Sequence, residues 1–243
     1  MNKMSQQTPK FEVLFGILFL VLAGLIFLNS GLFAIKHVII KGNIDIPSED
    51  ILLSAKLNNY KNIFQVNIGL MKQSILENPR IATVTITRQI PDKIIIIVKE
   101  RQSYCLLAYK NNFLIVGEDS VIIGVKDENE LYDLPIVTGV QLESVKIGEK
   151  INNLEFNNAI EILDYADENL RQMISEFNLS SYQLYLDLPN SKNTIKVELG
   201  NSNQLEKKIY NLRAILTSTS PNELEKIDLR VPDLATVIRI KTP

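Results

Sequence analysis

Residues 82–100 read ATVTITRQIPDKIIIIVKE, and this stretch decides the fold class. Pro91-Asp92 predicts a turn near its middle. The run Ile94–Val98 after the turn is rich in β-branched residues and is typical of a strand buried on both faces. The part before the turn alternates apolar residues with threonine, as a half-buried strand does: Ala82, Val84 and Ile86 against Thr83, Thr85 and Thr87. Two strands of one sheet are therefore expected here.

The segment before this pair predicts one more strand and two helices. Ile35–Lys41 alternates as a strand does and ends at a glycine-asparagine turn. Ser48 can cap a first helix, and Asn67 can cap a second helix that Pro79 ends. The apolar positions of these helices are Ile51, Leu52, Ala55 and Leu57, then Leu70, Met71, Ile75 and Leu76. Phe33–Glu100 is thus predicted to be a β-α-α-β-β unit.

The rest of the chain is predicted to be mostly strand, with two helices. One helix begins near Leu154, and Asn203 can cap the other together with Glu206 as a capping box. Pro189-Asn190-Ser191 would close a hairpin between two of the strands. The expected strands are Phe113–Val116, Ser120–Ile123, Leu134–Val137, Tyr182–Leu188, Thr194–Leu199, Ile227–Arg230 and Ala235–Ile240.

The first of these two helices has an apolar stripe at steps of three, four or seven residues. Its members are Phe156, Ile160, Leu163, Leu170, Ile174 and Phe177. Core packing is favoured over a coiled coil because the stripe lasts only about three repeats. Four acidic residues lie largely off the stripe and indicate a solvated face, with an acidic metal site as the alternative: Glu161, Asp164, Asp167 and Glu168.

An apolar segment near the N-terminus predicts a membrane anchor. Val13–Leu28 contains no polar side chain, and only Asn29 and Ser30 interrupt the apolar stretch before Ile35. As a helix this stretch would reach about 35 Å, enough for a bilayer core of roughly 30 Å. A cleaved secretory signal is the alternative, although its apolar region would be shorter. The lysines on the two sides nearly balance, so charge alone leaves the orientation open: Lys3 and Lys10 before, Lys36 and Lys41 after.

Composition and motifs argue against catalysis and against nucleic-acid binding. The formal net charge is −2, without the basic balance of a nucleic-acid binder. With His37 and Cys105 as the only residues of their kinds, the common zinc ligand sets and a disulfide cannot form. Cys105 is expected to be a small buried apolar residue. No nucleotide-binding or hydrolase motif occurs, so we predict no enzyme activity, no cofactor, no metal and no small-molecule substrate.

The order of these parts resembles the FtsQ/DivIB cell-division proteins of bacteria. A short tail, one span, a β-α-α-β-β unit of the POTRA type and a second β-rich domain follow one another. The likeness covers nearly the whole chain and depends on the order and spacing of several motifs. In chain order these are Val38–Asn43, Asn62–Val66, Asn78–Ile81, Val84, Arg88–Ile94, Val98–Arg101, Leu134–Gly139 and Ile227–Arg230.

The resemblance implies an α+β protein with a single N-terminal transmembrane helix, a POTRA domain and a mixed β-rich domain with two helices. The expected boundaries are a cytoplasmic tail at 1–12, the span at 13–33, the POTRA domain at 34–101 and the β domain at 102–243. A non-enzymatic scaffold of the division machinery is implied, a single-pass type II protein of the inner (plasma) membrane with its bulk outside the cytoplasm at the septum. FtsB- and FtsL-type membrane proteins are the expected partners.

In that family the C-terminal β domain offers an edge strand to its partner, and Ala235–Lys241 is the matching segment. Backbone hydrogen bonds would bind the partner, with Thr236, Ile238 and Ile240 on one face and Val237, Arg239 and Lys241 on the other. The expected contact residues are Arg230, Val231, Ala235, Thr236, Val237, Ile238, Arg239 and Ile240. The alternative is that Arg239 and Lys241 protect an exposed edge from aggregation.

Two other functions stay open from the sequence. A POTRA-bearing periplasmic chaperone or secretion component would receive unfolded β-barrel segments, although such proteins usually carry several POTRA units. A membrane-anchored envelope enzyme would need a clustered pair of carboxylates, which the many acidic residues do not exclude.

Overall fold

The computed structural model describes residues 9–57, 61–127, 133–188 and 193–240. Residues 1–8 of the expected tail, the predicted turn Pro189-Asn190-Ser191 and Lys241 lie outside the described residues. The chain divides into two compact units, Met1–Glu100 and Arg101–Pro243.

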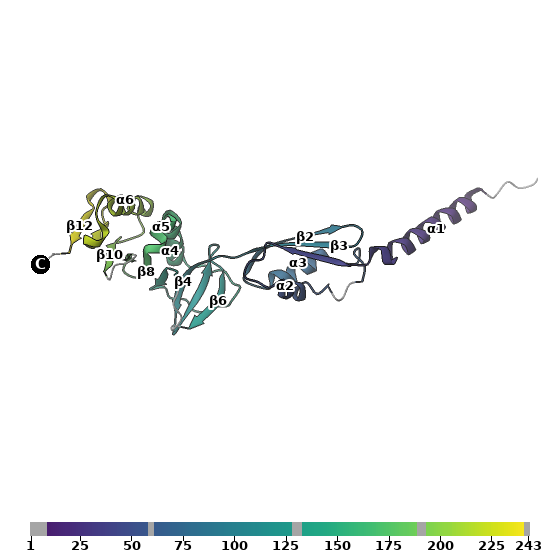
Figure 1. The fold of residues 1–243 in the computed structure, drawn as a ribbon, viewed down its shortest axis with the longest axis horizontal. Helices are drawn as coiled ribbons and strands as arrows, with labels where there is room; N and C mark the ends of the chain where they lie inside the picture. The colour runs from purple at the N-terminus through teal and green to yellow at the C-terminus, as the bar shows by residue number, and fades with distance from the viewer. Residues whose placement is uncertain (1–8, 58–60, 128–132, 189–192, 241–243) are drawn as a thin grey trace, which may run out of the picture. The chain divides into compact units, whose positions relative to one another are not determined.

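The first unit joins an apolar helix to a small sheet covered by two helices, which confirms the predicted β-α-α-β-β order (Figure 1). Strand β1 pairs in parallel with β3, and β3 pairs antiparallel with β2, in the order β1-β3-β2. The elements are α1 (Pro9–Leu28), η1 (Gly31–Phe33), β1 (His37–Lys41), α2 (Ser48–Ser54), α3 (Ile68–Leu76), β2 (Ile81–Gln89) and β3 (Lys93–Glu100).

Strand β3 is buried on one face only, so the prediction of burial on both faces is wrong. Ile94 and Ile96 are fully buried, whereas Ile97, the next residue of the strand, is 46% exposed. The reason is that one layer of helices covers the sheet: Met71 of α3 and Ile51 of α2 belong to the same core cluster as Ile94 and Ile96. The isoleucine run therefore places alternate side chains in the core and in solvent.

The loop after β1 is held by a buried carboxylate. Glu100 is 5% exposed and accepts hydrogen bonds from the backbone N–H groups of Ile44, Asp45 and Ile46. Burial raises the pKa of Glu100, but these three hydrogen bonds and the charge of Arg80 outweigh it, and the pKa lies below its usual value. The end of β3 and the loop are thereby fixed to each other.

One predicted helix cap of this unit is confirmed and one is wrong. The side chain of Asn67 accepts a hydrogen bond from the backbone N–H of Leu70 at 3.1 Å, which caps α3. Ser48 is the first helical residue of α2 and not its cap, because Pro47 takes the capping position. The Ser48 hydroxyl oxygen instead accepts a hydrogen bond from the side-chain amide of Asn43 in the preceding turn.

The second unit is a nine-stranded mixed sheet with helices, as the predicted α+β class requires (Figure 1). The strand order is β12-β11-β10-β9-β8-β7-β4-β5-β6. The pairs β4–β7, β7–β8 and β10–β11 are parallel and the others antiparallel. The elements are β4 (Ser103–Tyr109), β5 (Asn112–Gly117), β6 (Ile122–Asp127), β7 (Ile136–Thr138), α4 (Leu154–Tyr165), α5 (Glu168–Met173), β8 (Ile174–Asn178), β9 (Gln183–Asp187), β10 (Thr194–Glu198), α6 (Leu205–Ser218), η3 (Pro221–Glu223), β11 (Leu224–Asp228), η4 (Pro232–Leu234) and β12 (Thr236–Arg239).

The single long helix predicted from Leu154 to Phe177 is wrong beyond Tyr165. Asp167 is extended and caps a separate helix, α5, by accepting from the N–H of Leu170 at 2.9 Å. The last residues of the stripe form β8, which lies between β7 and β9 in the sheet. Pairing with β7 and β9 therefore overrides a helical spacing, and Phe177 is fully buried from a strand.

Helix α6 does not begin with the predicted capping box. Its N-cap is Gln204 in the left-handed region (φ 54°), with no hydrogen bond from its side chain, so the expected role of Asn203 is wrong. Lys208 one turn later is only 1% exposed, and its ammonium donates to the carbonyls of Leu199 (2.7 Å) and Asn201 (3.0 Å). A buried lysine thus fixes the start of α6 to the end of β10.

The core of the second unit lies between the sheet and its helices. Cys105 of β4 is fully buried there, as predicted, and burial raises the pKa of its thiol to about 12. Such a thiol is inert at neutral pH.

Candidate partner-binding edge

Strand β12 is the outermost strand of the nine-stranded sheet. It pairs with β11 on one side and is the terminal member of the strand order on the other. All four of its residues are exposed, whereas the inner strands alternate between buried and exposed positions. The edge of β12 is therefore open to another chain, as far as the described residues show.

The backbone polarity of this edge follows from the register. Ile240 donates its N–H inward to the carbonyl of Glu223 at 2.8 Å, and Ile238 lies opposite Lys226. Because the N–H and C=O groups of successive strand residues point to opposite sides, Val237 and Arg239 direct theirs outward. These two residues offer the donors and acceptors that an added strand would pair with.

The side chains of β12 are apolar on both faces. Val237 lies opposite Ile227, which is fully buried, yet Val237 itself is 38% exposed because the core ends at this strand. Ile238 on the other face is 52% exposed. The strand therefore has the predicted alternation and leaves uncovered apolar area on each face.

A short helical turn presents this strand and is fixed to helix α6. The side-chain amide of Asn211 donates to the carbonyl of Pro232 at 2.7 Å, and Lys207 pairs with Asp233 at 2.6 Å. Beside these contacts Val231 and Leu234 remain 53% and 74% exposed. Sequence reasoning missed Leu234, because a leucine in a loop between proline and a strand gives no periodic signal.

Arg230 is engaged within the chain. Its guanidinium bonds both carboxylate oxygens of Asp228, the shorter contact being 2.6 Å, and lies 3.7 Å from Glu198. These hydrogen bonds from Arg230 lower the pKa of Asp228 despite its partial burial. Gly200 (φ +75°) passes so close that a Cβ there would come within 2.9 Å of the Arg230 side chain. Arg230 thus supports the turn, and it is 62% exposed beside the edge.

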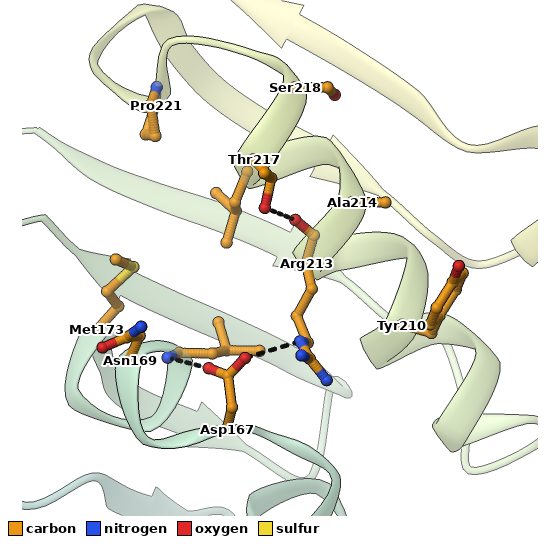
Figure 2. Close-up of a pocket in the computed structure, with 11 residues that line it drawn as sticks. Asp167, Asn169, Met173, Tyr210, Arg213, Ala214, Thr217, Ser218 and Pro221 are labelled. Atoms are coloured by element: carbon orange, nitrogen blue, oxygen red, sulfur yellow. Dashed lines mark hydrogen bonds and ion pairs between the residues drawn. The ribbon is translucent and has the colours of Figure 1, made fainter.

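A hollow of about 560 Å³ between α5 and α6 lacks the features of an active site (Figure 2). Figure 2 shows Asp167 facing Arg213, with which it pairs at 2.8 Å, while it also caps α5. The Thr217 hydroxyl donates back to the carbonyl of Arg213 at 2.8 Å. These polar groups are bound to each other or to helix ends, so they do not converge on a substrate position.

The acidic residues of α4 and α5 do not gather into a metal site. Within the described parts of the chain no group of His, Cys, Asp and Glu is placed to hold a metal ion. Asp164 instead accepts a hydrogen bond from the Tyr104 hydroxyl at 2.6 Å, and burial together with this bond raises the pKa of Tyr104. Glu161 accepts from Tyr165 at 2.9 Å.

Helix α1 is long and apolar enough to cross a membrane. Its apolar part is Phe11–Leu28, and none of this part is buried against the rest of the chain. Length and composition are thus consistent with a membrane anchor at the N-terminal end. The exposure of this helix along its apolar length in the described structure argues against a core helix.

An apolar N-terminal helix, a β-α-α-β-β unit and a second unit built on a mixed nine-stranded sheet define a class of α+β proteins with two units. The family models agree: residues 33–101 match the POTRA domain of FtsQ type, and residues 106–230 match the C-terminal domain of the cell division protein FtsQ/DivIB. Strand β12 lies beyond the matched residues.

Named relatives point the same way. The chain is 33% identical over 143 residues to cell division protein DivIB of Clostridium acetobutylicum, covering 57% of each chain. It is 30% identical to DivIB of Clostridium botulinum (strain Hall), covering 86% of this chain and 81% of the relative. A cell division protein FtsQ of Syntrophotalea carbinolica is 24% identical over 60% of this chain and 51% of the relative. The chain belongs to the FtsQ/DivIB family of cell-division proteins, and it is not an enzyme.

Proposed function

We propose that this protein is a membrane-anchored scaffold that links division proteins at the septum through its extracytoplasmic units. The anchor would be 13–33, with a cytoplasmic tail at 1–12, a POTRA domain at 34–101 and a β domain at 102–243. The orientation, with the N-terminus inside, follows the family resemblance. FtsB- and FtsL-type membrane proteins are the partners we propose.

The observation that carries the proposal is the open edge of β12. Outward-pointing backbone groups at Val237 and Arg239 can pair with a strand of the partner, as in β-strand addition. Exposed apolar side chains on both faces, Ile238 above all, would lose their contact with water in the same step. A long-lived monomer with such an edge would be prone to aggregation, which favours a bound partner.

The contact surface we propose has the strand at its centre. Ala235, Thr236, Val237, Ile238, Arg239 and Ile240 would contact the partner directly, and Arg230 and Val231 would border it. Leu234 joins them because it is the most exposed apolar residue of the turn. Arg239 would serve both purposes, as a contact in the complex and as a charge that discourages self-pairing in the free protein.

A substitution that removes one outward N–H group tests the edge. Val237→Pro deletes that donor, and proline is tolerated on an edge strand where the N–H faces solvent. Binding to a purified FtsB-type extracytoplasmic segment should fall by about tenfold, the equivalent of roughly 1.4 kcal/mol, with little change in melting temperature. Val237→Thr is the matched control, since it keeps the shape and the N–H and should bind as wild type. A folded Val237→Pro variant that binds normally would overturn the docking edge.

The place of action is tested separately in dividing cells. A fluorescent fusion of the full chain should concentrate at midcell before constriction. Uniform envelope fluorescence would contradict the septal role. In a separate binding assay, capture of unfolded β-barrel segments by the purified protein would favour the chaperone alternative.

A further inference from the structure

The end of the anchor helix is tied directly to the POTRA unit. Asn62 is 6% exposed, and its side-chain amide donates to the carbonyl of Leu28, the last residue of α1, at 2.7 Å. Its oxygen accepts from the N–H of Phe64 at 2.8 Å. The ring of Phe33 contacts both Phe27 of α1 (5.4 Å between centroids) and Phe64 (5.0 Å). A buried side chain and three aromatic rings therefore join helix and domain.

This joint fixes the height of the domain relative to a bilayer. The apolar part of α1 has 18 residues. At about 1.5 Å per residue it spans roughly 27 Å, close to the thickness of the hydrocarbon core. Leu28 would thus lie at the edge of that core, where the headgroup layer adds about 5 to 7 Å on each side. Asn62 is hydrogen-bonded to Leu28 and would lie within the headgroup layer.

The surface of the POTRA unit at this end carries exposed apolar side chains. Leu32 is 50% exposed, Phe64 42% and Ile90 61%. Ile90 belongs to the turn between β2 and β3, and this turn lies at the same end because the carbonyl of Asp92 accepts from the N–H of Lys36 at 3.0 Å. We call these three residues, with the cations described next, the membrane-proximal rim.

The end of the unit near the anchor carries more cations than carboxylates. Lys36, Lys61, Arg88 and Lys93 lie at the end near the anchor, with Asp92 as the carboxylate paired to Lys36 at 3.8 Å. At the opposite end, beyond β1 and before β2, carboxylates and cations are mixed: Asp45, Glu49, Asp50 and Glu77 lie there with Lys41, Arg80 and Lys99. The cationic end thus faces the side where phosphate headgroups would lie.

We propose that the membrane-proximal rim is a lipid-contact surface that docks the POTRA unit on the headgroup layer of the outer leaflet. Leu32, Phe64 and Ile90 enter the interface, and the surrounding cations pair with the phosphates of anionic lipids. Amphipathic and apolar side chains beside basic residues are what an anionic interface selects. The proposal rests on α1 spanning the membrane, as the proposed function states.

The absence of tryptophan from the chain allows a direct measurement of depth. Single-tryptophan variants Ile90→Trp and Phe64→Trp of the full chain are reconstituted into phosphatidylglycerol–phosphatidylethanolamine vesicles that contain a headgroup nitroxide lipid. Ile44→Trp is the matched control, since Ile44 is 77% exposed in the same unit and lies beyond the far end of β1. Over β1 alone the chain advances roughly 13 Å. Tryptophan fluorescence at positions 90 and 64 should be quenched severalfold more than at 44.

The charged part is tested by reversal. In the Ile90→Trp background, Lys61→Glu with Lys93→Glu should reduce quenching severalfold in phosphatidylglycerol vesicles and change it little in phosphatidylcholine vesicles. Lys41→Glu with Lys99→Glu, at the far ends of β1 and β3, is the control pair and should change neither. Circular dichroism melting confirms that each variant is folded.

The outcomes separate this inference from the proposed anchor. Leu18→Trp reports on the span through an acyl-chain nitroxide. If position 18 is quenched but 90 and 64 behave like 44, the rim is not a lipid surface and the anchor stands. If position 18 is not quenched, both fall. If the tryptophans at positions 90 and 64 become shielded from water only after an FtsL-type partner is added, a protein and not lipid covers the rim, and the lipid-contact proposal is wrong.

Discussion

The two outer strands of the nine-stranded sheet, β6 and β12, differ in how their outer edges are covered. At the start of β6, a returning segment covers the edge: Ile122 donates to the carbonyl of Glu149 at 3.0 Å and accepts from the N–H of Gly148 at 2.8 Å. The strand then ends in Lys126 and Asp127, charges that discourage pairing. Strand β12 has no such cover among the described residues, and its four exposed residues include Val237 and Ile238.

This difference teaches that the open edge is not a general property of the sheet. The chain covers the start of one edge with its own backbone and leaves the other edge open, with apolar side chains exposed on both faces. An exposed apolar edge of this kind supports the proposal that a partner strand pairs there.

Proline placed in the two edges should give very different losses of stability. Ile122→Pro removes a hydrogen bond and a buried side chain, and we expect a loss of about 3 to 5 kcal/mol in the free energy of unfolding. Arg239→Pro, whose N–H points outward, should cost less than about 1 kcal/mol. Urea unfolding of both variants measures the difference. Equal losses would show that β12 is covered in the free protein.

A charge on the exposed apolar face of each edge should affect binding at one edge only. Ile238→Glu should weaken partner binding by about tenfold or more, because the side chain would be buried in the complex. Val125→Glu on β6 is the matched control, at 43% exposure, and should leave binding unchanged. Titration calorimetry with the purified partner gives both values. Equal weakening would move the docking site away from β12.

The support under the open edge should contribute a smaller amount. Asn211→Ala removes the hydrogen bond to the carbonyl of Pro232, and we expect a loss of about 1 kcal/mol in stability and a modest loss of partner affinity. Asn158→Ala, which removes the hydrogen bond from its side-chain amide on α4 to the Tyr182 hydroxyl, serves as the comparison for affinity. Hydrogen exchange at residues 232–238 should speed up in Asn211→Ala alone.

The smallest effect should come from the ion pair beside β12, and it depends on pH. The folded-state pKa of Asp228 is lowered, so its contribution is present above the unfolded value of about 3.9 and is lost as pH falls through the folded value. Asp228→Asn should cost less than about 1 kcal/mol at pH 7, because the pair is partly exposed. The difference from wild type should vanish in acid. A difference that persists there would assign the effect to packing.

Most strands of the molecule could be predicted from local pattern, and the failures have a common cause. The alternation in residues 82–87 is visible without any partner because one face of that strand is more buried than the other, whereas all four residues of the last strand are exposed. Strand β4 was missed, and β8 was assigned to a helix, because neither strand alternates: β4 has four successive buried residues, and a bulge in β8 places its two buried residues three positions apart. Asp167 followed by Glu168 is a sequence signal for a helix N-cap and so for the start of a new helix. The apolar stripe that continues past Asp167 instead favours one long helix.

The candidate site was predictable only in part. The position of the last strand was expected from the family resemblance. Its exposure on both faces and the outward direction of the Val237 backbone groups depend on how β12 pairs with β11. The pairing of Arg230 with Asp228 likewise depends on the folded turn. Leu234 could not be identified, because its exposure depends on how Asn211 and Lys207 hold the turn.

The sequence by itself determined the apolar anchor, the lack of catalytic residues and the alternating strands, since each depends on residue type and local spacing alone. The tertiary structure decided which strand lies at an edge, which edge is covered and which end of the POTRA unit meets the anchor. Those outcomes depend on hydrogen bonds between residues far apart in the chain, such as Asn62 with Leu28 and Ile122 with Glu149. Such pairings are selected by the packing of the whole domain and leave no local pattern.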